Sequence, residues 1–292
     1  MNELQTITGT STTIKRWSLR NALNIITSRF RIIFLIFQHE FESSLKKSWK
    51  IRIILIIFLI PFLTMWLLPQ TIQNQDVERF LTINRMLNYF GIANFDFLSF
   101  FSLILLIIIS SELIAKEIEE NTLQLLIIKP INRSDILIGK ILSIFVPIFS
   151  LYSLTILLHL IDFHFKFAWS LETFISHLFL TWFPIILVAF LGFGTVVVVT
   201  VLFSLLFSRS VYGVLAALVV FIGNDLFFFN NPDFRFSYQL GVIVEEFLPL
   251  EALSVINLYQ SSDPILIIVI IISILITTFN LSLLALYRRE FS

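Results

Sequence analysis

The residues of this sequence that could do chemistry are the carboxylates and cations gathered in residues 111–140, a short charged segment between two apolar runs. Glu117, Glu120 and Gln124 recur at i, i+3 and i+7, which places them on one face of a helix. The apolar face opposite comprises Leu123, Leu126 and Ile127. Pro130 ends such a helix, because it lacks an N–H and its ring disfavours continuation. This pattern offers ionic and apolar docking of a protein partner, and it equally fits a solvated connection between two spans.

The sequence contains no recognisable catalytic or metal-binding motif. Gly139 and Lys140 lack the upstream glycine of a phosphate-binding loop, and no G-x-S-x-G or H-E-x-x-H pattern occurs. Cysteine is absent, which excludes disulfides and thiolate chemistry. His164 and His177 could share the outer face with Asp162, but interfacial polar residues explain them better than a zinc site. We therefore expect no enzyme, no metal and no cofactor in this chain.

The elements that position the charged segment are membrane spans. The chain of 292 residues is 57% hydrophobic and only 14% charged, with a mean hydropathy of +0.92. Soluble domains average about 25% charged residues. Apolar runs of the length needed to cross a hydrocarbon core of about 30 Å recur along the chain. The sequence predicts an all-α polytopic membrane protein with six transmembrane helices, at about residues 51–69, 97–115, 136–161, 178–207, 211–229 and 264–287.

Residues 1–50 precede the six-helix transmembrane domain, residues 51–292. Residues 1–14 are expected to form a disordered tail. Residues 15–50 are expected to form an amphipathic helix that lies in the membrane interface, since the apolar run inside them is too short for a seventh span. The apolar stripe of this helix comprises Ile26, Phe30, Ile33, Phe37, Phe41 and Leu45.

The distribution of positive charge predicts the orientation in the plasma membrane. Sixteen of the twenty Lys and Arg residues fall in segments that are cytoplasmic if the N-terminus lies inside. The four in the outer loops are Arg79, Arg85, Lys166 and Arg235. By the positive-inside rule, both termini and the charged segment lie in the cytoplasm.

Asn224 and Asp225 in the fifth predicted span are the clearest polar pair within a span. Polar residues in lipid are costly and face a bundle interior or cavity by default. They are candidate residues of a translocation path, with extension toward the outer headgroups as the favoured alternative.

The charged segment resembles the signature of permease subunits of type 2 ATP-binding-cassette (ABC) exporters. That pattern runs Ile-Ala-x-Glu-x-Glu-x-Gly-Thr-Leu, a Leu-Leu pair, Pro-Ile-x-Arg and a final Gly-Lys. The matching residues are Ile114, Ala115, Glu117, Glu119, Thr122, Leu123, Leu125, Leu126, Pro130, Ile131, Arg133, Gly139 and Lys140. Asn121 stands where the family has Gly, and Asn tolerates a left-handed backbone better than most residues.

The resemblance implies that residues 116–130 are a coupling helix docking on a separate ATPase. The residues to which it assigns coupling are Lys116, Glu117, Glu119, Glu120, Thr122, Leu123, Leu126, Pro130 and Arg133. It also makes residues 230–260 a candidate outer re-entrant hairpin, with an amphipathic loop lying flat as the alternative.

The implied partners are two copies of an ABC ATPase, which would bind ATP and Mg, and a second permease, identical or a sister chain. No nucleic acid is implied. Two other functions stay open: a mechanical or anchoring subunit that transmits ATPase strokes without transport, and an ATPase-independent secondary transporter. The latter would be supported by internal repeats or by charges deep in several spans.

Overall fold

The computed structural model describes residues 18–47, 97–119, 131–166, 171–177, 179, 182–207, 209–227, 240 and 264–288 of the chain. Within these residues the elements are helices, and no strand occurs among them. The first predicted span, residues 120–130 and nearly all of residues 230–260 lie outside the described residues.

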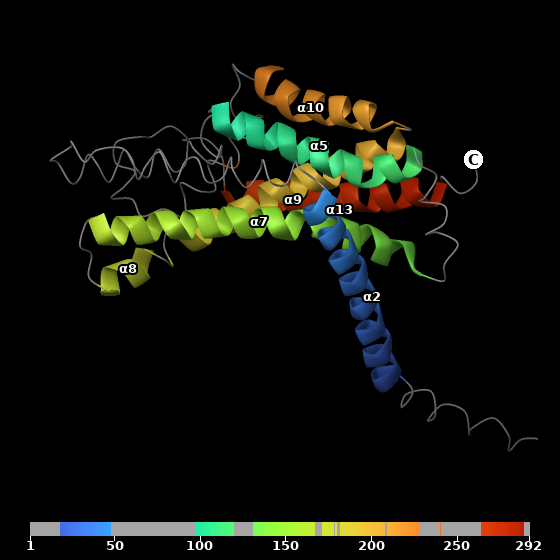
Figure 1. Ribbon diagram of the computed structural model, residues 1–292, viewed down its shortest axis with the longest axis horizontal. Helices are drawn as coiled ribbons and strands as arrows, with labels where there is room; N and C mark the ends of the chain where they lie inside the picture. The colour runs from blue at the N-terminus through green and yellow to red at the C-terminus, as the bar shows by residue number, and fades with distance from the viewer. Residues whose placement is uncertain are drawn as a thin grey trace, which may run out of the picture.

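Five of the helices form a bundle with α9 at its centre (Figure 1). They are α5 (Phe97–Glu119), α7 (Arg133–Lys166), α9 (Phe183–Leu206), α10 (Ser210–Phe227) and α13 (Pro264–Arg288). The other four all pack against α9, whose Val197, Val201 and Leu205 are fully buried. A helix that is apolar on every side can be enclosed in this way.

Three stretches in the described residues are long and apolar enough to cross a membrane: Arg133–Leu154, Ile186–Leu206 and Ile265–Arg288. The apolar part of α10, Ser210–Asn224, is shorter. The molecule is therefore an all-helical integral membrane protein in the part that the structure describes.

Two helices run further than the sequence pattern predicted. α5 continues to Glu119 rather than ending near residue 115, because no Gly or Pro interrupts a run of good helix formers. α7 continues to Lys166, so the short loop expected around Asp162 is helical. Pro147 lies inside α7 without ending it.

Pro184 falls inside the fourth predicted span, residues 178–207, yet it does not interrupt a helix. It lies in the first turn of α9, where its missing N–H has no helical acceptor in any case. Gly192 and Gly194 lie within a continuous helix, where they allow close packing. A Cβ atom on Gly192 would lie 3.0 Å from Cδ1 of Leu240, and one on Gly194 would lie 3.3 Å from Cδ1 of Leu275.

α2 (Ser18–Lys47) crosses the bundle steeply and packs along the first turns of α7 (Figure 1). It lies close to α7 at Gly139, where an added Cβ would lie 2.8 Å from Cγ2 of Ile36. Phe30 and Phe34 on another side of α2 are exposed, at 69% and 60%. Part of the predicted apolar stripe, including Ile33 and Phe37, is half-buried.

The small residues of α10 pack inside this subunit. Gly213 and Ala217 of the fifth predicted span are buried within this chain. A Cβ on Gly213 would lie 2.9 Å from Oγ of Ser111. These residues face inward because α10 packs closely against both α5 and α9.

Candidate functional site

The end of α5 contains the first residues of the predicted coupling segment. Lys116, Glu117 and Glu119 lie in its last two turns, so they continue a bundled helix rather than beginning a separate one. The remaining coupling candidates before α7 lie outside the described residues: Glu120, Thr122, Leu123, Leu126 and Pro130.

α7 begins directly after this segment. The carbonyl of Asn132 accepts hydrogen bonds from the backbone N–H groups of Asp135 and Ile136, which forms the first turn. Arg133, a predicted coupling residue, places its guanidinium 4.5 Å from the centre of the Tyr287 ring at the end of α13. A cation over an aromatic face is attracted by the ring quadrupole, so this contact joins the ends of α7 and α13.

Lys140, about two turns beyond Arg133 along α7, is the most buried charged group in the described residues. Its side chain is only 1% exposed. Its ammonium lies 2.8 Å from Oε1 of Glu40 on α2 and 2.5 Å from Oε1 of Glu117 on α5. A buried charge is tolerated only when it is paired and hydrogen-bonded, so these carboxylates explain how Lys140 can be buried.

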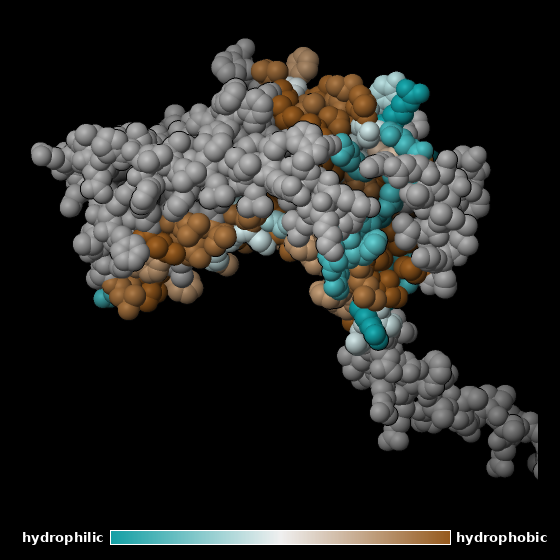
Figure 2. Space-filling view, viewed as in Figure 1, coloured by the Kyte–Doolittle hydropathy of each residue, from teal (hydrophilic) through white to brown (hydrophobic). Residues whose placement is uncertain are grey.

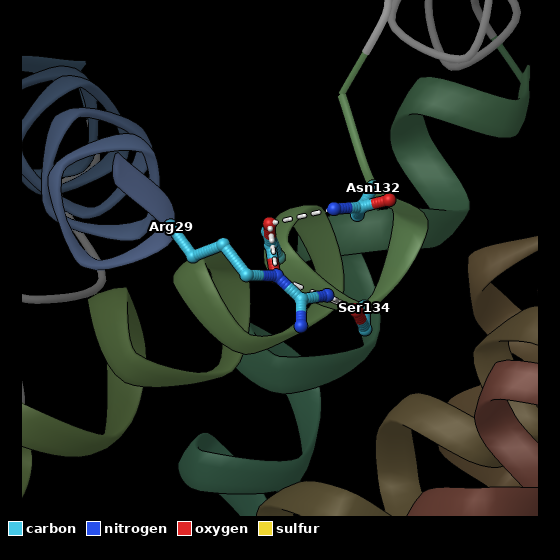
Figure 3. A network of polar contacts seen from close by, with 4 residues as sticks. Arg29, Asn132 and Ser134 are labelled. Carbon is cyan, nitrogen blue, oxygen red and sulfur yellow. Dashed lines mark hydrogen bonds and ion pairs between the residues drawn. The ribbon is translucent and has the colours of Figure 1, made fainter. Parts of the chain in front are cut away.

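A second ion pair joins α2 to the start of α7. Arg29 Nε lies 3.3 Å from the buried carboxylate of Asp135, and its Nη2 donates to Oγ of Ser134 at 3.2 Å. Figure 3 shows Arg29 reaching from α2 over the first turn of α7, toward Ser134. The side-chain amide of Asn132 donates to Oδ2 of Asp135 at 3.5 Å. The charged junction is defined here as Arg29, Glu40, Glu117, Asp135 and Lys140.

The charged junction has a net negative charge. Two cations, Arg29 and Lys140, face three carboxylates, which gives a formal charge of −1. Figure 2 shows hydrophilic residues gathered where α2 meets the bundle, while hydrophobic residues cover α10. The junction is therefore a polar site at one end of an otherwise apolar bundle.

The other side of the α5 end contacts the turn between α9 and α10. The backbone N–H of Ser210 donates to Oε1 of Glu119 at 2.7 Å. The first N–H groups of a helix have no partner within it, so this carboxylate stabilises the start of α10. Oγ of Ser111 donates to the carbonyl of Ser210 at 3.0 Å. Oγ of Ser204 on α9 lies 3.0 Å from Oγ of Ser111. The serine junction is defined here as Ser111, Ser204 and Ser210.

The structure does not bring the candidate translocation residues to this site. Asn224 is half-buried, about 21 Å along α10 from Ser210. Asp225 lies in the same helix, and its side chain is not among the described ones.

Four residues of the charged junction were absent from the predicted site: Arg29, Glu40, Asp135 and Lys140. The sequence did mark Lys140, because it is the second residue of the Gly-Lys pair that ends the motif. It did not mark Glu40 and Arg29, since their partners lie about a hundred positions away along the chain. Glu117 and Glu119 were predicted to face a partner, and both contact other helices of this chain.

The polar contacts of this site join helices to one another. Among the described residues there is no group of three or more His, Cys, Asp or Glu side chains arranged to hold a metal ion. The ion pairs instead join the start of α7 to α2 and to the end of α5, and a hydrogen bond joins the end of α5 to the start of α10.

An all-helical bundle with several helices long and apolar enough to cross a membrane defines the class of multi-pass integral membrane proteins. A sequence model of the ABC-2 family of transporter proteins matches residues 34–231, more than half of the chain, and the chain belongs to that family. No curated protein sequence matches it. The chain is an ABC transporter permease of the type 2 class, an integral membrane component of a family that is generally non-catalytic and pairs with an ABC ATPase.

Proposed function

We propose that this chain is the membrane permease subunit of an ATP-driven exporter, moved by a separate ATPase that docks on residues 116–133. The observation that carries the proposal is the family match over residues 34–231. The position of the docking segment adds support, since it joins the ends of α5 and α7, two helices of the bundle.

The proposed complex contains two permease chains, identical or sisters, and two ATPase subunits that bind ATP and Mg. Closure of the ATPase pair on ATP would push residues 116–133, and the spans would rock to open an outward path, as alternating access requires. The substrate path would run along the permease interface, with Asn224 and Asp225 as candidate lining residues.

The proposed topology has six spans in the cell membrane and both termini in the cytoplasm. The charge asymmetry of the sequence supports it. The contacts of Glu117 with Lys140, Glu119 with Ser210, and Arg133 with Tyr287 are consistent with it. All three join helix ends that this topology assigns to the cytoplasmic side.

α2 is proposed to lie in the cytoplasmic interface, with its exposed Phe30 and Phe34 toward the lipid. Residues 230–260 are proposed to form a re-entrant hairpin. Leu240 supports this, because it is buried against Gly192, about 14 Å along α9 from Phe183.

The test is co-purification of the ATPase with permease variants. Glu117 and Glu119 are unsuitable targets because they hold contacts within the chain. The variant Glu120→Lys with Leu126→Asp alters both predicted faces of the docking segment. It should abolish ATPase binding while the permease still inserts.

The matched control is Glu172→Lys on the exposed surface of α8 (Leu171–His177), which the proposed topology places outside. This control should bind the ATPase as the wild type does. Unchanged binding of the double variant would show that residues 116–133 are not the docking segment.

A further inference from the structure

Lys140 holds two carboxylates that arrive from different helices. Glu40 of α2 and Glu117 of α5 are nearly equally exposed, at 19% and 20%, and both bind the same ammonium. Because two negative charges share one positive charge, either carboxylate can leave and Lys140 still keeps an ion pair. Loss of the lysine, by contrast, would leave two like charges together.

The two carboxylates differ in what else holds their helices to α7. α2 has a second ion pair, Arg29 with Asp135, and a close contact between Ile36 and Gly139. α5 packs mainly against α9 and α10 and meets α7 at few positions. In the described residues, its ion pair with α7 is the one from Glu117.

The end of α5 is also fastened to the start of α10. Glu119 accepts the N–H of Ser210, and Ser111 donates to the carbonyl of the same residue. Gly213 leaves no room between these helices, since an added Cβ would lie 2.9 Å from Oγ of Ser111. Motion of the α5 end therefore moves the start of α10 with it.

α7 stays attached to the bundle deeper in the membrane. Phe145 and Phe149 pack edge-on against Phe190 of α9, with ring centres 5.1 and 5.7 Å apart. Tyr152 packs in the same way on Phe193. These contacts begin about 8 Å beyond Lys140 along α7. The end of α5 can therefore separate from α7 while α7 and α9 remain packed together.

We propose that the ion pair between Glu117 and Lys140 is a latch, which opens so that the ends of α5 and α10 move together away from a fixed α2–α7 pair. Lys140 and Glu117 are positioning residues, and Glu40 keeps Lys140 paired when the latch is open. The inference rests on the proposed function, since the docked ATPase would supply the force through residues 120–132.

The test compares two variants that each remove one carboxylate from the same lysine, Glu117→Gln and Glu40→Gln. The chain has no cysteine, so spin labels can be attached at Arg31→Cys on α2 and Val211→Cys on α10, both exposed positions. A second pair, Arg31→Cys with Val146→Cys, reports the α2–α7 distance. Labelled chains are diluted with unlabelled ones in lipid vesicles, and distances are measured by electron spin resonance without ATPase.

The wild type and Glu40→Gln should give a single α2–α10 distance, because Arg29 still holds α2 and Glu117 still holds α5. Glu117→Gln should add a second, longer distance, with the α2–α7 distance unchanged in every variant. The inference is overturned if the two variants behave alike, if Glu117→Gln shows only the wild-type distance, or if its α2–α7 distance changes. Should Glu117→Gln fail to fold, Glu117→Asp and Glu40→Asp make the same comparison with shortened carboxylates.

Addition of the ATPase and ATP separates this inference from the proposed function. The wild-type complex should then adopt the longer α2–α10 distance. The α2–α10 distance of the wild type could instead stay unchanged on addition of ATP while Glu117→Gln still shows two distances. That result would support the latch and refute the proposed coupling to the ATPase.

Discussion

Lys140 illustrates how a charged residue becomes part of a membrane protein's interior. Its side chain is almost fully buried, and its ammonium meets carboxylates from two other helices. An ion pair buried in this way adds little net stability relative to an apolar replacement of the whole group, but removal of one partner leaves the other charges uncompensated. The residue therefore fixes which helices meet at this point.

Replacement of this cation should destabilise the chain strongly. In Lys140→Met the stem is retained while Glu40 and Glu117 lose their shared partner, at a cost of about 3–5 kcal/mol. Arg31→Met on the exposed surface of α2 should change stability by less than about 0.5 kcal/mol. The measurement is thermal unfolding in detergent, and equal midpoints for the two variants would contradict the buried pairing.

At the scale of elements, close helix crossings depend on glycine. α2 crosses α7 at Gly139, where Ile36 and the carbonyl of Ile33 fill the space that a side chain would need. Gly223 in α10 is different, because an added Cβ would make only ordinary contacts at 3.8 Å with Phe227 and Val219. The two glycines are thus a matched pair, one at a crossing and one without such a constraint.

Alanine should lower the stability of the chain at Gly139 but not at Gly223. Gly139→Ala places a Cβ 2.8 Å from Cγ2 of Ile36, and overpacking of this kind costs about 1–3 kcal/mol. Gly223→Ala should be neutral or stabilise α10 by up to about 1 kcal/mol, because alanine has the higher helix propensity. Unfolding midpoints, together with proteolysis of α2, measure both. A Gly139→Ala chain as stable as the wild type would mean that α2 does not pack this closely on α7.

At the scale of the whole molecule, we propose that the second permease packs on the outward face of α10. Val211, Leu215 and Val219 recur every four residues and are more than half exposed. The small residues Gly213 and Ala217 face inward instead. A dimer through α10 would therefore use its β-branched and leucine side chains rather than close backbone contact.

Single cysteines along α10 test this arrangement in a chain that has none of its own. We expect Val211→Cys, Leu215→Cys and Val219→Cys to crosslink between subunits in membranes, with an efficiency that ATP and the ATPase alter. Ala217→Cys should not crosslink, because that position is fully buried within one subunit. Crosslinks at Ala217, or their absence along the whole exposed face, would place the dimer interface on another helix.

The sequence by itself determined the class of the protein and where its charged motif lies between two apolar runs. Long apolar runs and the charged motif between them are local patterns, and hydropathy or spacing within about twenty residues is enough to read them. The bounds of α10 and α13 follow closely from the same signals. The Gly-Lys pair of the motif marked Lys140, although nothing in the local pattern named its partners.

Only the tertiary structure decided what the charges of that motif do. Arg29 and Asp135 are 106 positions apart, and Glu40 and Lys140 are 100 apart, so no helical periodicity relates them. The contact of Glu119 with Ser210, which joins α5 to α10, is likewise between residues 91 positions apart. Burial fixes the pairs of Asp135 and Lys140, because a charge removed from water must meet its counterion wherever in the chain that counterion lies.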